Sequence, residues 1–171
     1  MKGSPRSLRG AGNAGVKTMV IPIKNLQLAI TDPGAAIAFV SAVIGGLPKG
    51  NVLLLGSVCN LQLFSASAGL ITNYTGNFSV GTVATADATL NGAEVNVIPS
   101  TAIAAATAKL SPLTRGQSTA PAIIDNTSLT TSNIPLPLNL NVIIPDASIS
   151  ANSILVANGT LWIAYTVLGD Y

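Results

Sequence analysis

Segments in which hydrophobic and polar residues alternate recur along the chain from residue 18 onward. The clearest is IPLPLNLNVIIP (134–145), where every second residue is Ile, Leu or Val and most of the others are Pro or Asn. Because successive side chains of a strand point to opposite faces, this pattern predicts a strand with one buried face. Its prolines confine the start of the strand to a sheet edge, since proline cannot donate to the hydrogen-bond ladder.

Other strand-like segments are rich in β-branched and aromatic residues and are separated by Gly, Pro, Asn and Asp. Together with 134–145, they give about eight predicted strands. They lie at 18–32, 35–46, 52–64, 77–84, 95–99, 122–127 and 153–170. Short strands separated by turn signals predict an all-β fold. We expect a single β-sandwich or jelly-roll domain over residues 18–171.

The last segment, 153–170, contains Asn158-Gly159, a dipeptide typical of a two-residue hairpin turn. We therefore expect a hairpin there. Both faces of its second strand, at 161–168, are apolar, and Trp162 lies on one of them. One face can fill the space between two packed sheets. The other face requires cover from a helix, from a loop or from a neighbouring subunit.

One segment has the pattern of a helix. STAIAAATAKL (100–110) offers Ser100 or Thr101 as an N-cap, an alanine-rich interior, Lys109 in the last turn and Pro112 just beyond. The pattern predicts one short helix, the only substantial one in the domain. With three turns or fewer, such a helix must pack against the body of the protein to be stable.

Charged residues make up only 8% of the 171 residues, and 49% are hydrophobic. About 25% charged residues is usual for a globular protein, so this chain has few charges with which to solvate its surface. That composition suits a subunit of an assembly. The longest apolar stretches, such as 52–58, fall well short of the ~20 residues of a membrane-spanning helix. We expect a protein that is made in the cytoplasm and has no membrane association.

Residues 1–17 differ from the rest of the chain, because they are rich in Gly, Ser, Pro and Ala and contain no acidic residue. They hold half of the eight positive charges, namely Lys2, Arg6, Arg9 and Lys17. Without an apolar face to bury, this arm is expected to be flexible in isolation. The remaining four positive and six negative charges give the body a net charge of 4 − 6 = −2, which argues against nucleic-acid binding by the body. The arm could contact an acidic partner surface or nucleic acid, or remain solvated.

Residues that carry catalytic or metal chemistry are sparse. The chain has no histidine, which removes the commonest general base and imidazole metal ligands, and its single cysteine, Cys59, cannot build a structural zinc site. Asp87 and Glu94 could act as a glycosidase pair or bind calcium. Turn and cap hydrogen bonding is the commoner role for acidic residues in such loops. We expect no enzymatic activity, no cofactor and no bound metal.

Three segments, read together, resemble a known family. They are LPKGNVLLLGSV (47–58), NFSVGTVATADATLNGAEVNVIPST (77–101) and GTLWIAYTVLGDY (159–171). A Pro-x-Gly turn before a Leu-rich strand, a Gly-Thr strand with a Thr-Ala-Asp-rich loop, and a closing Trp-containing strand are similar to small structural proteins of tailed bacteriophages. The resemblance covers most of residues 18–171 and points to the head decoration, or cement, proteins.

The resemblance implies a β-sandwich or jelly-roll subunit, commonly a homotrimer, that sits on the outer capsid surface of the virion. Such a subunit binds the major capsid protein and stabilises contacts between capsomers, after synthesis in the host cytoplasm. It implies no catalytic residues. The arm lies outside the matching segments, so partner contacts by Lys2, Arg6, Arg9 and Lys17 are inferred from their charge alone.

Two other function classes remain open. A phage tail or receptor-binding component would also be β-rich and oligomeric, and it should expose aromatic side chains; Tyr74, Phe78 and Tyr171 are the available candidates. A hydrolase that cuts cell-wall glycans would need a pair of carboxylates such as Asp87 and Glu94.

Overall fold

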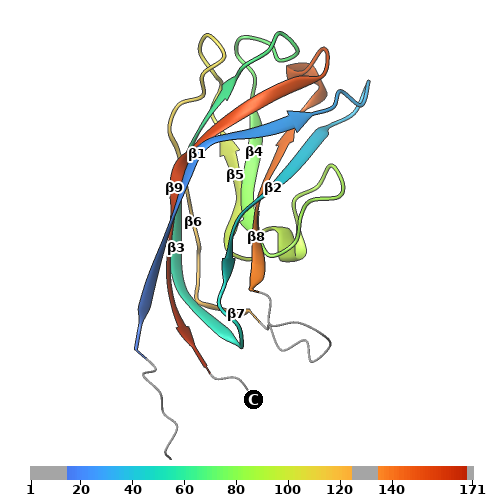
Figure 1. Ribbon diagram of the computed structural model, residues 1–171. Helices are drawn as coiled ribbons and strands as arrows, with labels where there is room; N and C mark the ends of the chain where they lie inside the picture. The colour runs from blue at the N-terminus through green and yellow to red at the C-terminus, as the bar shows by residue number, and fades with distance from the viewer. Residues whose placement is uncertain (1–14, 125–134, 169–171) are drawn as a thin grey trace, which may run out of the picture.

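The computed structural model describes residues 15–124 and 135–168 (Figure 1). Nine strands account for most of these residues. They are β1 (Lys17–Ile30), β2 (Ala38–Leu47), β3 (Val52–Ser65), β4 (Gly76–Gly81), β5 (Ile98–Ile103), β6 (Thr114–Gln117), β7 (Ala122–Ile124), β8 (Leu136–Ile144) and β9 (Ser153–Val167). Two single turns of 3-10 helix, η1 (Gly92–Glu94) and η2 (Asp146–Ser148), lie in the connections.

The strands form two antiparallel sheets. Sheet A has the order β1-β9-β3-β6, with β7 also paired to β3, and sheet B has the order β2-β8-β4-β5. The pairing is nested, because β1 pairs with β9, β2 with β8, β3 with β6 and β7, and β4 with β5. A chain that folds back on itself in this way and then rolls into two facing sheets is a jelly roll, so the expected all-β fold is confirmed.

The hydrophobic core lies between the two sheets. Along β8, Leu138, Leu140, Val142 and Ile144 all point inward with 0% exposure, as the alternating pattern of that segment predicted. Its start pairs with β2 alone, because β4 reaches only as far as Asn139, and a strand paired on one side tolerates proline. The opposing sheet contributes side chains that are also almost completely buried, namely Leu28, Ile30, Leu54, Leu61 and Leu63.

The prediction of a helix at 100–110 is wrong. The first residues of that segment belong to β5, which pairs with β4, and the remainder is a loop in which Ala108 and Lys109 have φ angles of 49° and 68°. Left-handed backbone of this kind ends any helix. The alanine-rich segment has little apolar surface of its own to bury, so the open edge of β4 offers more stabilisation than an isolated helix would.

The hairpin expected at Asn158-Gly159 is also wrong, because both residues lie in the middle of the continuous strand β9. The two halves of β9 pair with β1 and β3 instead of with each other. Asn158 accepts a hydrogen bond at 2.9 Å from the backbone N–H of Asn25, at the irregularity in β1. A Cβ at position 159 would lie 2.1 Å from the carbonyl oxygen of Asn60, so glycine is required there for close strand approach.

The chain's own loop at 82–97 covers the part of the outer face of sheet B around β4 and β8, whereas Phe39 and Val43 on β2 remain 41% and 62% exposed. Asn141 points away from the core and is nevertheless 0% exposed. Its Oδ1 accepts the N–H of Thr85 at 2.9 Å, and its Nδ2 donates to the carbonyl oxygens of Val83 and Glu94 at 3.1 and 3.0 Å. Ser79 on β4 donates a further hydrogen bond to the Glu94 carbonyl at 2.8 Å. One side chain of β8 thus holds both ends of the loop on the sheet.

Replacing Asn141 by alanine should detach this loop. The change leaves the buried N–H of Thr85 and the partly buried carbonyl of Val83 without their side-chain partner. We expect the free energy of unfolding to fall by roughly 3 kcal/mol, measured by urea denaturation. Asn77→Ala is the matched control, because Asn77 makes one exposed hydrogen bond to Ser100 and its loss should cost less than about 1 kcal/mol. Equal stabilities for the two variants would contradict the clamp role of Asn141.

Candidate docking face

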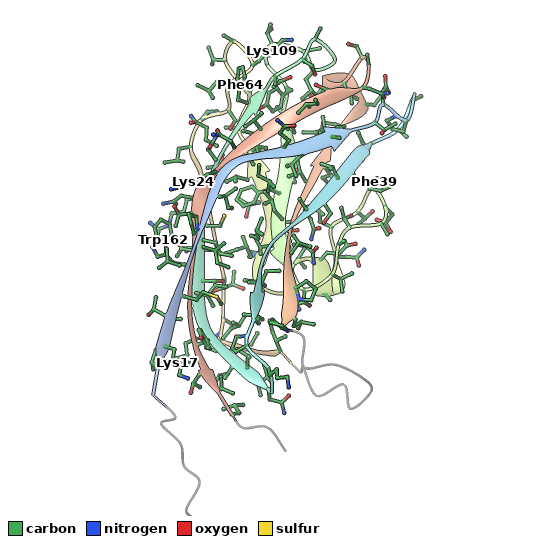
Figure 2. The ribbon with its side chains drawn as sticks, viewed as in Figure 1. Lys17, Lys24, Phe39, Phe64, Lys109 and Trp162 are labelled. Atoms are coloured by element: carbon green, nitrogen blue, oxygen red, sulfur yellow. The ribbon has the colours of Figure 1, made fainter. Side chains whose placement is uncertain are left out.

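The outer face of sheet A has no equivalent cover. On β9, Leu161 and Ile163 are 0% exposed and point into the core, whereas Trp162 between them is 38% exposed on the opposite side. Figure 2 shows Trp162 on the outer side of the sheet, away from the facing sheet B. The sequence analysis named a helix, a loop or a neighbouring subunit as possible cover for this face. The helix expected at 100–110 is absent, because that segment forms part of β5 and a loop. Among the described residues, no loop covers the indole, which is 38% exposed.

An apolar cluster surrounds this tryptophan. Trp162 pairs across the sheet with Val20 on β1 and Val58 on β3, and Val20 is 54% exposed. One row further along, the cross-strand partners are the small residues Ala164 and Gly56, next to an irregularity in β3. Small side chains beside a large indole leave an open groove of about 430 Å³. We call Val20, Trp162 and Val58, with this groove, the Trp162 lobe.

The groove has a partly polar rim. Gln117, Ser118 and Thr18 line it together with Leu55 and the indole. Ser118 is held in place by the backbone of β3, because its Oγ accepts the N–H of Ser57 at 2.8 Å and its own N–H donates to the Ser57 carbonyl at 2.9 Å. The groove therefore combines an apolar floor with a few fixed hydrogen-bonding groups, as ligand and partner sites commonly do.

A second apolar cluster lies toward the other end of the same face. Phe64 on β3 is 44% exposed, pairs with Val156 on β9, and bridges to Leu110 in the loop before β6. Ile154 lies two residues from Val156 on the same side of β9 and is 39% exposed. We call these four residues the Phe64 lobe. Figure 2 shows Phe64 and Trp162 along the same side of the molecule, well separated along the strands.

Polar and cationic side chains separate the two lobes. Thr160, Asn60 and Arg115 form one cross-strand row, and Lys24 lies near it on β1. Arg115 and Lys24 are both exposed. We call these residues, with Asn158, the polar strip. Within the described strands of sheet A, no residue is acidic.

The described carboxylates lie elsewhere, in turns and loops. Asp32 accepts the N–H of Gly34 at 2.9 Å, and Asp87 accepts the N–H of Thr89 at 2.7 Å. Glu94 accepts the N–H of Asn91 at 3.1 Å through one oxygen and that of Ala86 at 3.4 Å through the other. These are the turn and cap roles that acidic residues commonly take in loops. Asp87 and Glu94 therefore share a loop, and each organises its backbone.

The other residues singled out for chemistry are enclosed. Cys59 is 0% exposed, and burial raises the pKa of its thiol to about 12, which leaves it protonated and unreactive at neutral pH. Burial likewise raises the pKa of Tyr74 to about 12, and its hydroxyl donates to the Leu63 carbonyl at 2.8 Å. Among residues 15–124 and 135–168, no group of three or more Cys, Asp or Glu side chains could hold a metal ion. Nor does this part of the chain contain a helix long and apolar enough to cross a membrane.

The sequence-based prediction of exposed aromatic residues was wrong for Tyr74 and Phe78. Tyr74 and Phe78 are both 0% exposed, and Tyr171 lies outside the described residues. Trp162, Phe64 and Phe39 are the aromatic side chains with substantial exposure in the described part. The alternation of residues along 161–168 had already placed Trp162 and Leu161 on opposite faces of the strand. Arg115 lies beside Asn60 because of the lateral order of the strands in the sheet, and no local sequence pattern predicts that order.

The four arm residues are only partly placed. Lys17, assigned to the end of the arm, is the first residue of β1 and pairs with Tyr165. Lys2, Arg6 and Arg9 lie outside the described residues.

No protein-family model matches the chain, and no curated protein matches it in sequence. Similar solved structures include the infectious bursal disease virus VP2 subviral particle, at 13% identity and a TM-score of 0.41 over 87% of this chain and 32% of that one. The T13 particle of the same virus gives 14% identity and a TM-score of 0.42, covering 87% of this chain and 31% of that one. The structure of the Gx strain of the virus gives 17% identity and a TM-score of 0.39, and the match covers 92% of this chain and 33% of that one. The chain thus spans about a third of the length of these structures, and its jelly-roll assignment rests on the strand pairing itself.

Trp162 is the sole tryptophan of the chain, so its fluorescence reports directly on this face. At low protein concentration, we expect acrylamide to quench the emission readily, because the indole is 38% exposed. The urea-unfolded protein provides the upper limit of quenching. Emission that acrylamide barely quenches in the dilute folded protein would contradict an open face. A fall in quenching as the protein concentration rises would indicate that a second copy covers the face.

Proposed function

We propose that the chain is a structural virion protein, a capsid decoration or cement protein that binds the outer capsid surface through the outer face of sheet A. The observation that carries the proposal is the asymmetry of the sandwich. Its own loop, clamped by Asn141, covers part of the outer face of sheet B, whereas no described loop covers Trp162, Val20 and Phe64 on the outer face of sheet A. Exposed apolar surface of this kind marks a site of protein association.

The charge pattern of the strands supports a structural role. Sheet B has no charged residue in any of its four strands, and sheet A has three cations, Lys17, Lys24 and Arg115. A molecule with so few strand charges is better suited to a crowded assembly than to free solution. The sequence resemblance at 47–58 and 159–171 points to the same class of protein.

The proposal includes partners and location. The major capsid protein is the partner beneath the face, and the protein acts in the virion after synthesis in the host cytoplasm. Copies associate with one another as homotrimers, and binding stabilises contacts between capsomers. The carboxylates of Asp87 and Glu94 accept hydrogen bonds from backbone groups of their own loop, and the proposal gives them no catalytic role.

A receptor-binding component of a phage tail is the second candidate. One observation favours it: the groove beside Trp162 has Gln117 and Ser118 on its rim. An indole with neighbouring amide and hydroxyl groups can contact the apolar and polar sides of a small ligand. Binding of the protein to host cells, in place of binding to capsids, would identify this function.

Replacing Trp162 by serine tests the docking face. A central aromatic residue in an interface commonly contributes about 2 kcal/mol or more, so affinity for purified parent capsids stripped of the protein should fall about 30-fold. Phe39→Ser is the matched control, because Phe39 on β2 is similarly exposed, at 41% against 38%, and lies on the other side of the sandwich. Sedimentation checks that both variants keep the oligomeric state of the parent protein. Equal capsid binding by the two variants would refute the assignment.

The arm provides an independent prediction. We propose that Lys2, Arg6, Arg9 and Lys17 anchor the subunit to an acidic neighbouring surface. Deleting residues 1–16 should leave the domain folded, because β1 begins at Lys17. Capsid occupancy should fall, most clearly at low salt, since exposed ion pairs are screened over about 8 Å at physiological ionic strength. Unchanged occupancy between about 20 and 500 mM salt, a range that moves the screening length severalfold, would show that the arm is not an anchor.

A further inference from the structure

We propose that the outer face of sheet A is complementary to a protein surface in which carboxylates lie between two apolar patches. This inference rests on the proposed docking function and specifies the chemistry of the partner. It follows from the order in which side chains occur along the face, from the Trp162 lobe through the polar strip to the Phe64 lobe. Each boundary between these zones is set by the strand register.

The spacing of the two lobes follows from β3. Val58 belongs to the Trp162 lobe and Phe64 to the Phe64 lobe, and they point to the same side of this strand six residues apart. At about 3.3 Å per residue, this separation is roughly 20 Å. The partner should therefore present two apolar patches about 20 Å apart, a span that fits within one standard protein interface.

The cations define what lies between those patches. Lys24 is on β1 and Arg115 on β6, the first and last strands in the order β1-β9-β3-β6. Three strand spacings separate them, or about 14 Å. Thr160, Asn60 and Asn158 lie between them without charge. The described strands of sheet A contain no carboxylate, so they offer these cations no counter-charge when the face is desolvated, and a partner with carboxylates supplies it.

A second copy of the same face does not satisfy this requirement. A two-fold contact places this face against the same face of a second copy. When the two-fold axis passes through the polar strip, the cations of one copy face those of the other, and neither strip contains a carboxylate. Like charges facing each other in an interface are strongly unfavourable. A nucleic acid also fits poorly, because affinity for a phosphate backbone requires many cations, and this face has two between its apolar lobes. An acidic, partly apolar protein surface satisfies both the lobes and the strip.

Charge reversal at single positions tests the inference on stripped parent capsids. Lys24→Glu and Arg115→Glu should each weaken binding at least tenfold, and the loss should shrink as salt is raised. Lys49→Glu is the matched control, because it changes the net charge equally at an exposed position in the β2–β3 turn, outside the strands of sheet A. Lys24→Arg should bind like the parent protein. All of these side chains are exposed, so the variants should fold normally, which circular dichroism can verify.

The outcomes separate this inference from the proposed function. If Trp162→Ser loses binding while Lys24→Glu and Arg115→Glu bind like Lys49→Glu, the face docks but its partner is not acidic, and the inference is wrong. If Trp162→Ser binds normally, the proposed docking face fails and the inference fails with it.

A photoreactive amino acid at position 18, an exposed position that lines the groove beside Trp162, tests the identity of the partner directly. Irradiation of decorated particles should join the chain to an acidic segment of a different virion protein. Cross-links only between copies of this chain would overturn the inference. So would loss of capsid binding in an excess of free hexoses, because the groove beside Trp162 would then be a saccharide site.

Discussion

The pairing of β9 on both sides is the constraint on which the rest of the structure depends. Its partners are β1 and β3, both long strands, and the two ladders run along nearly its whole length. Two fixed ladders remove any freedom of β9 to slip or rotate, because a shift of one residue would exchange its two faces. Leu161 and Ile163 are thereby committed to the core, and Trp162 is committed to solvent. The same fixed register of β9 that directs Leu161 and Ile163 into the core therefore also leaves Trp162 on the open outer face.

The outward-pointing side chains of the two sheets differ in what they contact. In sheet B, an outward asparagine accepts and donates hydrogen bonds to a loop, so a polar residue becomes a buried clamp. In sheet A, the outward residues are mainly apolar or neutral, and no loop of the described residues is fixed over the Trp162 lobe. The first arrangement stabilises the domain itself, whereas the second leaves apolar surface that the described residues do not bury.

Local sequence patterns predicted the all-β class, the inward residues of β8 and the uncovered side of 161–168, because each depends on alternation within a single strand. They failed where a distant strand decides the structure. The 100–110 segment has the composition of a helix, but its first residues pair with the edge of β4 that β8 leaves open. Asn158-Gly159 has the composition of a turn, yet β1 and β3 supply ladders on both sides of it. The polar strip and the lobes also depend on strand order, which no local pattern encodes.

The nested pairing has a consequence for synthesis. Lys17 lies beside Tyr165, so the first strand of the domain has its only ladder partner in the last one (Figure 1). While the chain emerges from the ribosome, β1 has no strand with which to pair, and sheet A closes only after β9 has been released. Folds dominated by such distant contacts form slowly and expose unpaired edges in the meantime. The apolar outer face of sheet A is therefore complete only after β9 has been synthesised, which delays contact between such faces until each core has closed.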